Sequence, residues 1–300
     1  MSDAVPTDLR PAAPGVAARR VPVPGRRPVP RVLAVAGSDP SGGAGIQADL
    51  KSVAAAGGYG MAAVTALTAQ STRGVTGVHV PPPAFLAQQL ATLSADVAID
   101  AVKIGMLASA EVAAVVADWL ASGPGVEPGA GRPPVVLDPV MVATSGDRLL
   151  DAAAQDAVRD LLDHADVVTP NVPELAVLLA EPQAVDWEGV LEQATRLAAR
   201  HGVLVVAKGG HLDGSTVLDA LVGPTGSVAE LAAPRVRTSS THGTGCSLSS
   251  GLATRYAAGG DWCRALRETK EWLTAAIAAG EELEVGRGHG PVDHFVRLRP

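Results

Sequence analysis

Short apolar runs alternate along the chain with longer segments in which apolar residues recur every three or four positions. The short runs predict buried strands at residues 32–36, 61–67, 101–104, 135–137, 166–169, 203–207, 216–221 and 227–231. The longer segments predict helices at residues 46–56, 85–93, 111–120, 151–162, 173–179, 187–200, 245–257 and 262–282. Because strands alternate with helices, the pattern predicts an α/β fold with a mostly parallel central sheet and helices on both faces.

No internal repeat or linker divides the sequence, so residues 31–300 are expected to form a single domain. Residues 1–30 are rich in Pro, Ala and Arg and lack the apolar run of a secretory signal, which predicts a disordered N-terminal extension. Gly and Pro residues predict a surface loop at 121–134 and a hairpin turn at 223–226. No later stretch has the roughly 18 uninterrupted apolar residues of a transmembrane helix.

Composition narrows the classes of function. Hydrophobic residues make up 47% of the 300 residues, enough for a sizeable core. The net charge of −7 argues against a broad nucleic-acid or membrane-surface footprint. A local phosphate site remains compatible with that charge, because it needs only backbone N–H groups and one or two cations. Two cysteines, Cys246 and Cys263, are too few for a disulfide framework and favour a reducing, cytoplasmic compartment.

A glycine-rich segment, residues 36–45 (AGSDPSGGAG), follows the first predicted strand. It is not a P-loop, because no Gly-Lys-Ser/Thr ends it. Two interpretations remain open from these residues alone. The glycines tighten the connection from strand to helix, or they let a ligand approach the backbone closely.

A second segment, residues 242–246 (HGTGC), opens the helix predicted at 245–257. Its glycines leave backbone N–H groups unobstructed at a helix N-terminus, which suits the negative charge of a transferring phosphoryl group. Cys246 stands in the first turn, where the same field is expected to lower a thiol pKa. A buried structural cysteine is the alternative, but the flanking glycines favour a functional one.

Polar residues end several predicted strands. Asp138 closes one strand, Asn171 and Glu174 follow the next, and Lys208 ends the one after. At the carboxyl edge of a parallel sheet such carboxylates can hold Mg²⁺ and such a lysine can neutralise a phosphate oxygen. Each alone is a weak signal, because Asn171 could cap a helix and Asp138 could cap a turn. Their joint occurrence at one edge favours a site.

Seven segments together resemble the ribokinase-like kinases, and among them the hydroxymethylpyrimidine/phosphomethylpyrimidine kinases of thiamine biosynthesis. They are residues 36–51 (AGSDPSGGAGIQADLK), 65–70 (TALTAQ), 103–107 (KIGML), 137–141 (LDPVM), 169–174 (TPNVPE), 208–211 (KGGH) and 241–246 (THGTGC). The resemblance covers nearly everything from Arg31 to the C-terminus. It implies a homodimeric, ATP- and Mg²⁺-dependent enzyme that converts 4-amino-5-hydroxymethyl-2-methylpyrimidine to its monophosphate and then its diphosphate.

The resemblance also implies roles for individual residues. Gln70 matches the family's pyrimidine-binding glutamine, whose amide can donate to and accept from an aminopyrimidine edge. The other implied positions are Gly37, Asp49 and Met106 in the pyrimidine pocket, Asp138 and Glu174 at the metal, Asn171, Lys208 and Thr244 at the nucleotide, and Gly243, Thr244, Gly245 and Cys246 at the anion hole and catalytic base. In this hypothesis the Cys246 thiolate accepts the hydroxyl proton and Lys208 neutralises the leaving diphosphate.

Three other functions share some of these sequence features. A pyridoxal or pyridoxine kinase would share the fold and the base; Gln70 and Met106 favour the pyrimidine. A non-catalytic sensor is disfavoured by the intact 243–246 segment, and a sugar kinase by Cys246, because most relatives that act on sugars carry Asp there. Two departures from the family are the thirty-residue extension and the lack of a following thiamine-phosphate synthase domain, so no second activity is expected.

Overall fold

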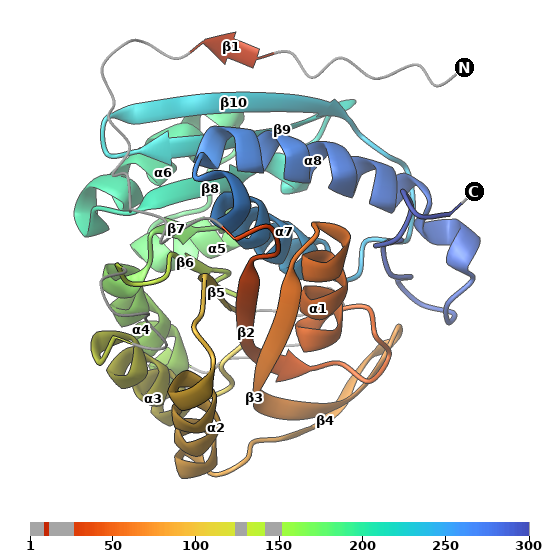
Figure 1. The fold of residues 1–300 in the computed structure, drawn as a ribbon. Helices are drawn as coiled ribbons and strands as arrows, with labels where there is room; N and C mark the ends of the chain where they lie inside the picture. The colour runs from red at the N-terminus through yellow and green to blue at the C-terminus, as the bar shows by residue number, and fades with distance from the viewer. Residues whose placement is uncertain (1–8, 12–26, 124–130, 142–151, 300) are drawn as a thin grey trace.

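The computed structural model describes residues 9–11, 27–123, 131–141 and 152–299. The strands form one sheet in the order β1-β10-β9-β8-β7-β6-β5-β2-β3-β4 (Figure 1). The strands are β1 (Leu9–Pro11), β2 (Arg31–Ser38), β3 (Tyr59–Ser71), β4 (Gly74–His79), β5 (Ala101–Ile104), β6 (Val135–Leu137), β7 (Val167–Val168), β8 (Leu204–Lys208), β9 (Thr216–Gly223) and β10 (Gly226–Pro234). The α-helices are α1 (Gly45–Ala55), α2 (Pro83–Asp96), α3 (Ala110–Ala121), α4 (Ala152–Asp160), α5 (Val172–Leu179), α6 (Trp187–His201), α7 (Thr244–Gly259) and α8 (Trp262–Ala278).

The middle of the sheet is parallel and its two edges are antiparallel. Strands β3, β2, β5, β6, β7 and β8 pair in parallel, whereas β4 at one edge and β9, β10 and β1 at the other pair antiparallel. The parallel strands β5, β6 and β7 are buried along their whole length. Strands covered on both faces need continuous apolar sequence, which is why the short apolar runs identified them. The predicted mostly parallel sheet is confirmed.

Two layers of helices cover the sheet. On one face, α2 to α6 bury a cluster that includes Leu90, Val116 and Leu175. On the other face, α1, α7 and α8 bury a cluster that includes Val53, Leu252 and Trp272. In the second cluster the rings of Tyr256 and Trp262 stack with their centroids 3.5 Å apart. Because both faces are covered, ligands can reach the parallel strands only at their ends.

The structure departs from the predicted elements in a few places. Strand β3 extends to Ser71 and turns into β4, which the apolar pattern does not predict. Gly74–His79 contains two glycines and lies at the sheet edge with no buried residue. Helix α8 ends at Ala278 and a 3₁₀ turn, Gly280–Leu283, follows it. Within the predicted N-terminal extension, Leu9–Pro11 pairs with β10. Residues 1–8, 12–26 and 124–130 and the predicted helix start at Asp151 lie outside the described residues.

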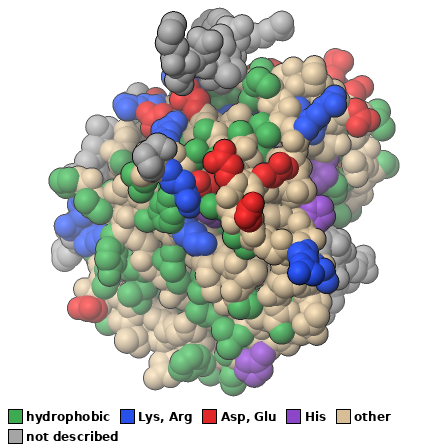
Figure 2. All heavy atoms as spheres, turned by 90° about the vertical axis from the view of Figure 1, so that its right-hand side faces the viewer, with side chains coloured by type: hydrophobic (Ala, Val, Ile, Leu, Met, Phe, Trp, Pro, Cys, Tyr) green, Lys and Arg blue, Asp and Glu red, His purple; other side chains and the backbone are tan. Residues whose placement is uncertain are grey.

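The surface agrees with the charge balance of the sequence. The face in Figure 2 carries acidic side chains near its centre, with basic and apolar side chains around them. The described residues on this face form no continuous basic surface, in keeping with the net charge of −7. Among the described residues, no helix combines the length and the apolar character that crossing a membrane requires.

We expect the central strand β2 to be a main source of stability. Leu33 is 0% exposed in that strand, so Leu33→Ala should lower the free energy of unfolding by about 2–5 kcal/mol, through lost burial and a residual cavity. Leu298 is 76% exposed, and the same change there should stay within about 0.5 kcal/mol. Urea unfolding of both variants checks this. Equal losses of unfolding free energy in the two variants would mean that burial of the leucine does not determine how much stability the substitution removes.

Candidate active site

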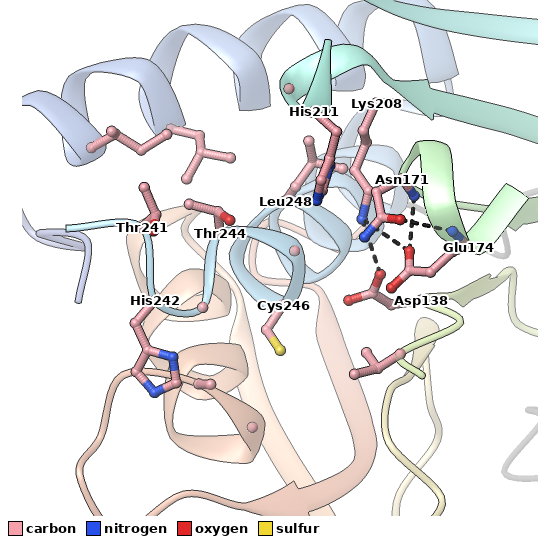
Figure 3. A pocket seen from close by; sticks show the side chains of 18 of the residues that line it. Asp138, Asn171, Glu174, Lys208, His211, Thr241, His242, Thr244, Cys246 and Leu248 are labelled. Atoms are coloured by element: carbon pink, nitrogen blue, oxygen red, sulfur yellow. Dashed lines mark hydrogen bonds and ion pairs between the residues drawn. The ribbon is translucent and has the colours of Figure 1, made fainter. Parts of the chain in front are cut away.

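A cavity of about 680 Å³ lies at the carboxyl edge of the parallel strands. Its walls come from the loops that follow β2, β5, β6 and β8, from the end of β3 and from the starts of α5 and α7. It brings together all but one of the predicted site residues: Gly37, Gln70, Met106, Asp138, Asn171, Glu174, Lys208, Gly243, Thr244, Gly245 and Cys246. Figure 3 shows the Cys246 side chain in the middle of this group.

The start of α7 provides an anion-binding turn. Gly243 caps the helix with a φ of 79°, and a Cβ there would overlap the carbonyl oxygen of Gly43. The backbone N–H groups of Thr244, Gly245 and Cys246 belong to the first turn and have no partner within the helix. Thr244 N–H also donates to Thr241 O at 3.3 Å, outside the helix. The positive end of a 16-residue helix and the N–H groups of its first turn suit a phosphoryl group.

A buried contact between His242 and Asp39 fastens this turn to the glycine-rich loop after β2. His242 Nε2 lies 2.8 Å from Asp39 Oδ2, and the Asp39 carboxylate also accepts hydrogen bonds from Ser41 and the backbone N–H groups of Gly43 and Ala44. Burial alone would raise the pKa of Asp39, but these hydrogen bonds outweigh it and lower the pKa to about 2. Both residues stood in the segments that the sequence singled out, but a spacing of 203 residues gave no reason to pair them.

The thiol of Cys246 lies where two helices begin. Cys246 is in the first turn of α7, and the N–H of Gly45, at the start of α1, donates to its sulfur. Burial raises the pKa of this thiol to about 12; Lys103 opposes the shift, and Asp49 and Asp138 add to it. The expectation that the helix field lowers this pKa is therefore wrong, because desolvation of the thiolate is the larger effect. The free protein holds Cys246 as a thiol.

Two carboxylates and a lysine form the polar side of the cavity. Lys208 Nζ lies 3.4 Å from Asp138 Oδ1 and 4.0 Å from Glu174 Oε2 (Figure 3). Burial raises the pKa of Glu174 to about 7, an effect that Lys208 opposes. Asn171 caps helix α5, as the alternative interpretation of the sequence had it. The Asn171 side chain accepts a hydrogen bond from Glu174 N–H, and Asn171 N–H donates to the Glu174 carboxylate. The cap fixes Glu174 against the cavity that both residues line.

These carboxylates suit a divalent cation that also binds phosphate. Asp138 and Glu174 offer oxygen ligands, which Mg²⁺ prefers. No group of three or more His, Cys, Asp or Glu side chains at metal-binding geometry occurs in the described part of the chain. A pair of carboxylates fits Mg²⁺ better than a metal that needs a full protein cage, because Mg²⁺ keeps several waters and shares its remaining positions with phosphates.

At another part of the cavity, Gly37, Met106 and Gln70 form a small pocket wall. A Cβ on Gly37 would overlap the Met106 methyl group, so the glycine makes room for that side chain. The Thr68 hydroxyl lies 3.1 Å from Gln70 Oε1 and orients the amide. Gln70 stands on the part of β3 beyond the predicted strand, so its position depends on the pairing of β3 with β4.

Asp49 lies elsewhere than the resemblance implied. It is fully buried on α1, outside the residues that line the cavity, and its carboxylate pairs with Lys103 at 2.7 Å. The sequence placed both residues in characteristic segments, but a helical charge is ordinarily solvated, and nothing in its spacing indicated burial.

The cavity also has an apolar part that the sequence did not reveal. Its side chains come from β9, the loop after β10, α7 and α8: Val217, Val236, Leu248, Leu273 and Ile277. Beside them Lys270 pairs with Asp219 at 2.6 Å. An apolar slot next to a phosphate-binding turn can take the flat ring of a nucleotide base.

A glycine-rich strap, residues 286–290 (GRGHG), connects distant walls of the site. The N–H groups of Arg287 and Gly288 donate to the Thr72 hydroxyl, and His289 N–H donates to Thr72 O, next to the end of β3. Gly290 O accepts from His242 N–H, at the anion-binding turn. The strap therefore joins the hairpin that carries Gln70 to the turn that carries Cys246.

The family model described as phosphomethylpyrimidine kinase matches residues 39–293, which include most of the chain and all the cavity-lining residues except Ala36, Gly37 and Ser38. The chain belongs to the phosphomethylpyrimidine kinase family. The hydroxymethylpyrimidine/phosphomethylpyrimidine kinase of Escherichia coli is 46% identical over 264 residues, covering 88% of this chain and 96% of that protein.

Other family members are larger, and some structural neighbours carry a different name. A thiamine biosynthesis multifunctional protein of Corynebacterium efficiens is 53% identical over 270 residues, which is 90% of this chain and 36% of that protein. The chain thus spans about a third of that relative. Among solved structures, Bacillus subtilis pyridoxal kinase in an ADP complex has a TM-score of 0.80 at 30% identity, covering 90% of this chain and 100% of that one. Phosphomethylpyrimidine kinase of Clostridium difficile has a TM-score of 0.70 at 33% identity, covering 83% and 99%.

We predict that Gly243→Ala separates the anion-binding turn from the Gly43 loop. The variant should lose about a hundredfold in phosphoryl transfer, the order of an anion-hole donor, because the N–H groups move. Gly202, at the end of α6, has a similar φ of 65° and nothing within 4 Å of a Cβ, so Gly202→Ala is a matched control for backbone strain. Kinase assays and thermal unfolding of both variants test this; a similar loss of activity in the control would contradict it.

Proposed function

We propose that this chain is an ATP-dependent kinase that phosphorylates the hydroxymethyl group of 4-amino-5-hydroxymethyl-2-methylpyrimidine and then converts the monophosphate to the diphosphate. The observation that carries the proposal is the position of Cys246. Its thiol stands in one cavity with the Gln70 and Met106 wall and with the anion-binding turn at Gly243–Cys246. Membership of the phosphomethylpyrimidine kinase family supports the same activity.

In the first step the hydroxymethyl oxygen attacks the γ-phosphorus of ATP. The new O–P bond forms as the bond to ADP breaks, and the hydroxyl proton passes to Cys246 in those molecules whose thiol has first lost its proton to solvent. The N–H groups of Thr244, Gly245 and Cys246 hold the charge on the transferring group. Lys208 neutralises charge on the nucleotide phosphates, and Gln70 orients the pyrimidine through its amide.

We propose that Mg²⁺ is the metal and that Asp138 and Glu174 hold it. When bound, it neutralises charge on the phosphate oxygens. Lys208 keeps the two carboxylates close together, and the cap from Asn171 fixes the direction of Glu174. Thr169 donates to Asp138 Oδ1 at 3.0 Å and orients the other carboxylate.

We also propose a cytoplasmic homodimer. Two free cysteines, Cys246 and Cys263, fit a reducing compartment. The edge formed by β3 and β4 exposes the apolar side chains of Tyr59, Leu67 and Val78, and an open apolar edge strand invites pairing with another copy. Three relatives of about this length are named hydroxymethylpyrimidine/phosphomethylpyrimidine kinase, and each matches 88% of this chain.

Pyridoxal is the second candidate substrate, because pyridoxal kinases of Bacillus subtilis and Staphylococcus aureus share the fold at 30% and 29% identity. Purified protein with ATP and Mg²⁺ should convert the hydroxymethylpyrimidine to its monophosphate and then to its diphosphate. Mass spectrometry of the reaction mixture measures both products. A parallel reaction with pyridoxal should give little product. Pyridoxal phosphate as the main product, with little pyrimidine turnover, would replace the first proposal with the second.

We predict that Cys246→Ala slows the first phosphorylation about 10²–10⁴-fold, the range of a general base, and leaves the second nearly unchanged. The second nucleophile is a phosphate monoester with a second pKa of about 6, so it is already an anion near neutrality. Because burial raises the thiol pKa to about 12, the thiolate fraction and the first rate should rise about tenfold per pH unit from pH 7 to 9. Single-turnover kinetics of each step measure this; equal losses in both steps would remove the base assignment.

A further inference from the structure

A fully buried ion pair lies behind the cavity wall and has no part in the mechanism described so far. Lys103 on β5 and Asp49 on α1 are both 0% exposed, with Nζ and Oδ1 2.7 Å apart. Ser250 on α7 donates to the same Oδ1 at 2.8 Å, and Asp49 Oδ2 has no hydrogen-bond partner among the residues that the structure describes. Buried pairs rarely stabilise a fold better than apolar side chains of the same size. A charge pair in the centre of the sheet therefore calls for another explanation.

The helical register places this pair one turn behind the thiol. Ser250 follows Cys246 by four residues on α7, and Asp49 follows Gly45 by four residues on α1. Residues four apart stack on one face of a helix. Gly45 N–H faces the Cys246 sulfur, and Ser250 contacts Asp49. The two helices thus meet at two successive levels, with the thiol at the first and the ion pair at the second.

Gly105 leaves the space that the lysine needs. A Cβ at Gly105 would lie 2.7 Å from Lys103 Nζ and 3.0 Å from the Ala36 Cβ. The neighbouring residues Met106 and Gly37 line the cavity itself. The ammonium group therefore lies directly beneath the floor of the cavity, without being exposed to it.

We propose that Lys103 is a positioning residue for the phosphoryl transfer: its fixed ammonium stabilises the negative charge on the Cys246 sulfur, and Asp49 and Ser250 hold it in place. This inference rests on the proposed function, in which that sulfur takes the hydroxyl proton. Lys103 itself neither gains nor loses a proton. The O–H bond of the substrate breaks, an S–H bond forms, and the lysine acts only through its field.

The charges around the thiol agree with this role. The groups that act on it are Lys103 from β5, Asp49 from α1 and Asp138 from the end of β6, together with the N–H of Gly45. Of the three side chains with the largest effects on the thiol, Lys103 lowers its pKa, whereas both carboxylates raise it. Burial would discharge the lysine, but Asp49, Cys246 and Asp138 outweigh burial and raise its pKa, so it stays positive.

Two substitutions should change the reactivity of the Cys246 thiol in opposite directions. Lys103→Met removes the stabilising charge and should slow alkylation of Cys246 by iodoacetamide at least about tenfold, the equivalent of one pKa unit. Asp138→Asn removes an opposing charge but keeps the Lys103–Asp49 pair, so it should speed alkylation. Damage to the fold would change both rates in the same sense, and that result would overturn the proposal. Alkylation is followed between pH 7 and 10 on the Cys246 peptide by mass spectrometry, so Cys263 does not contribute.

A second buried pair in the chain supplies the matched control. Lys270 on α8 pairs with Asp219 at 2.6 Å, and Lys270 is not among the groups with the largest effects on the thiol pKa. Lys270→Met should leave the alkylation rate of Cys246 within about twofold. A slowing equal to that of Lys103→Met would mean that loss of any buried lysine has this effect, and would refute a specific role.

The two kinase steps then separate a role in chemistry from a role in folding. Lys103→Met should slow the first phosphorylation at least about tenfold and leave the second, which needs no base, nearly unchanged. The double variant Lys103→Met/Asp49→Asn leaves no unpaired charge, so its thermal stability should recover while its first step stays slow. Recovery of the first step together with stability would overturn the proposal. The alkylation assay needs no kinase substrate. If the pyrimidine proves not to be the substrate, the alkylation rates still test the effect of Lys103 on the thiol.

Discussion

The close approach of two backbones at Gly43 and Gly243 is the constraint on which the site depends. A side chain at Gly43 would overlap His242, and one at Gly243 would overlap the carbonyl of Gly43. The start of α7 can lie against the start of α1 only because neither position carries a side chain. That contact places Gly45 N–H on the Cys246 sulfur, brings His242 to Asp39 and turns the first N–H groups of α7 toward the cavity.

Below this contact the charges are arranged in two layers. Lys208, Asp138 and Glu174 face the cavity, where they can exchange partners with a nucleotide and its metal. Lys103 and Asp49 lie one layer deeper and cannot reach a ligand. A lysine in contact with solvent or substrate changes its surroundings during each reaction cycle, whereas a buried one exerts a constant field. The two layers thus divide binding from the tuning of the thiol.

The sequence predicted the sheet well because buried parallel strands need continuous apolar runs, and it located most of the cavity because polar residues end those strands. It did not predict β4, whose glycines and exposed surface carry no periodic signal. It also missed the pairing of Asp39 with His242 and the depth of Asp49, since both depend on how α1 packs against α7. The thiol pKa was misjudged for the same reason: a helix start is visible in sequence, but the desolvation around it is a property of the packed fold.

The strap at residues 286–290 has a consequence for biosynthesis. It holds Thr72, beside the end of β3, and His242, at the start of the anion-binding turn, by backbone hydrogen bonds. On the ribosome the earlier elements emerge and begin to fold first, but the hydrogen bonds that the strap makes to these two walls can form only after the strap has left the exit tunnel. A ligand that contacts both walls can therefore gain this bracing only once residues 286–290 have been synthesised, well after all the strands of the sheet.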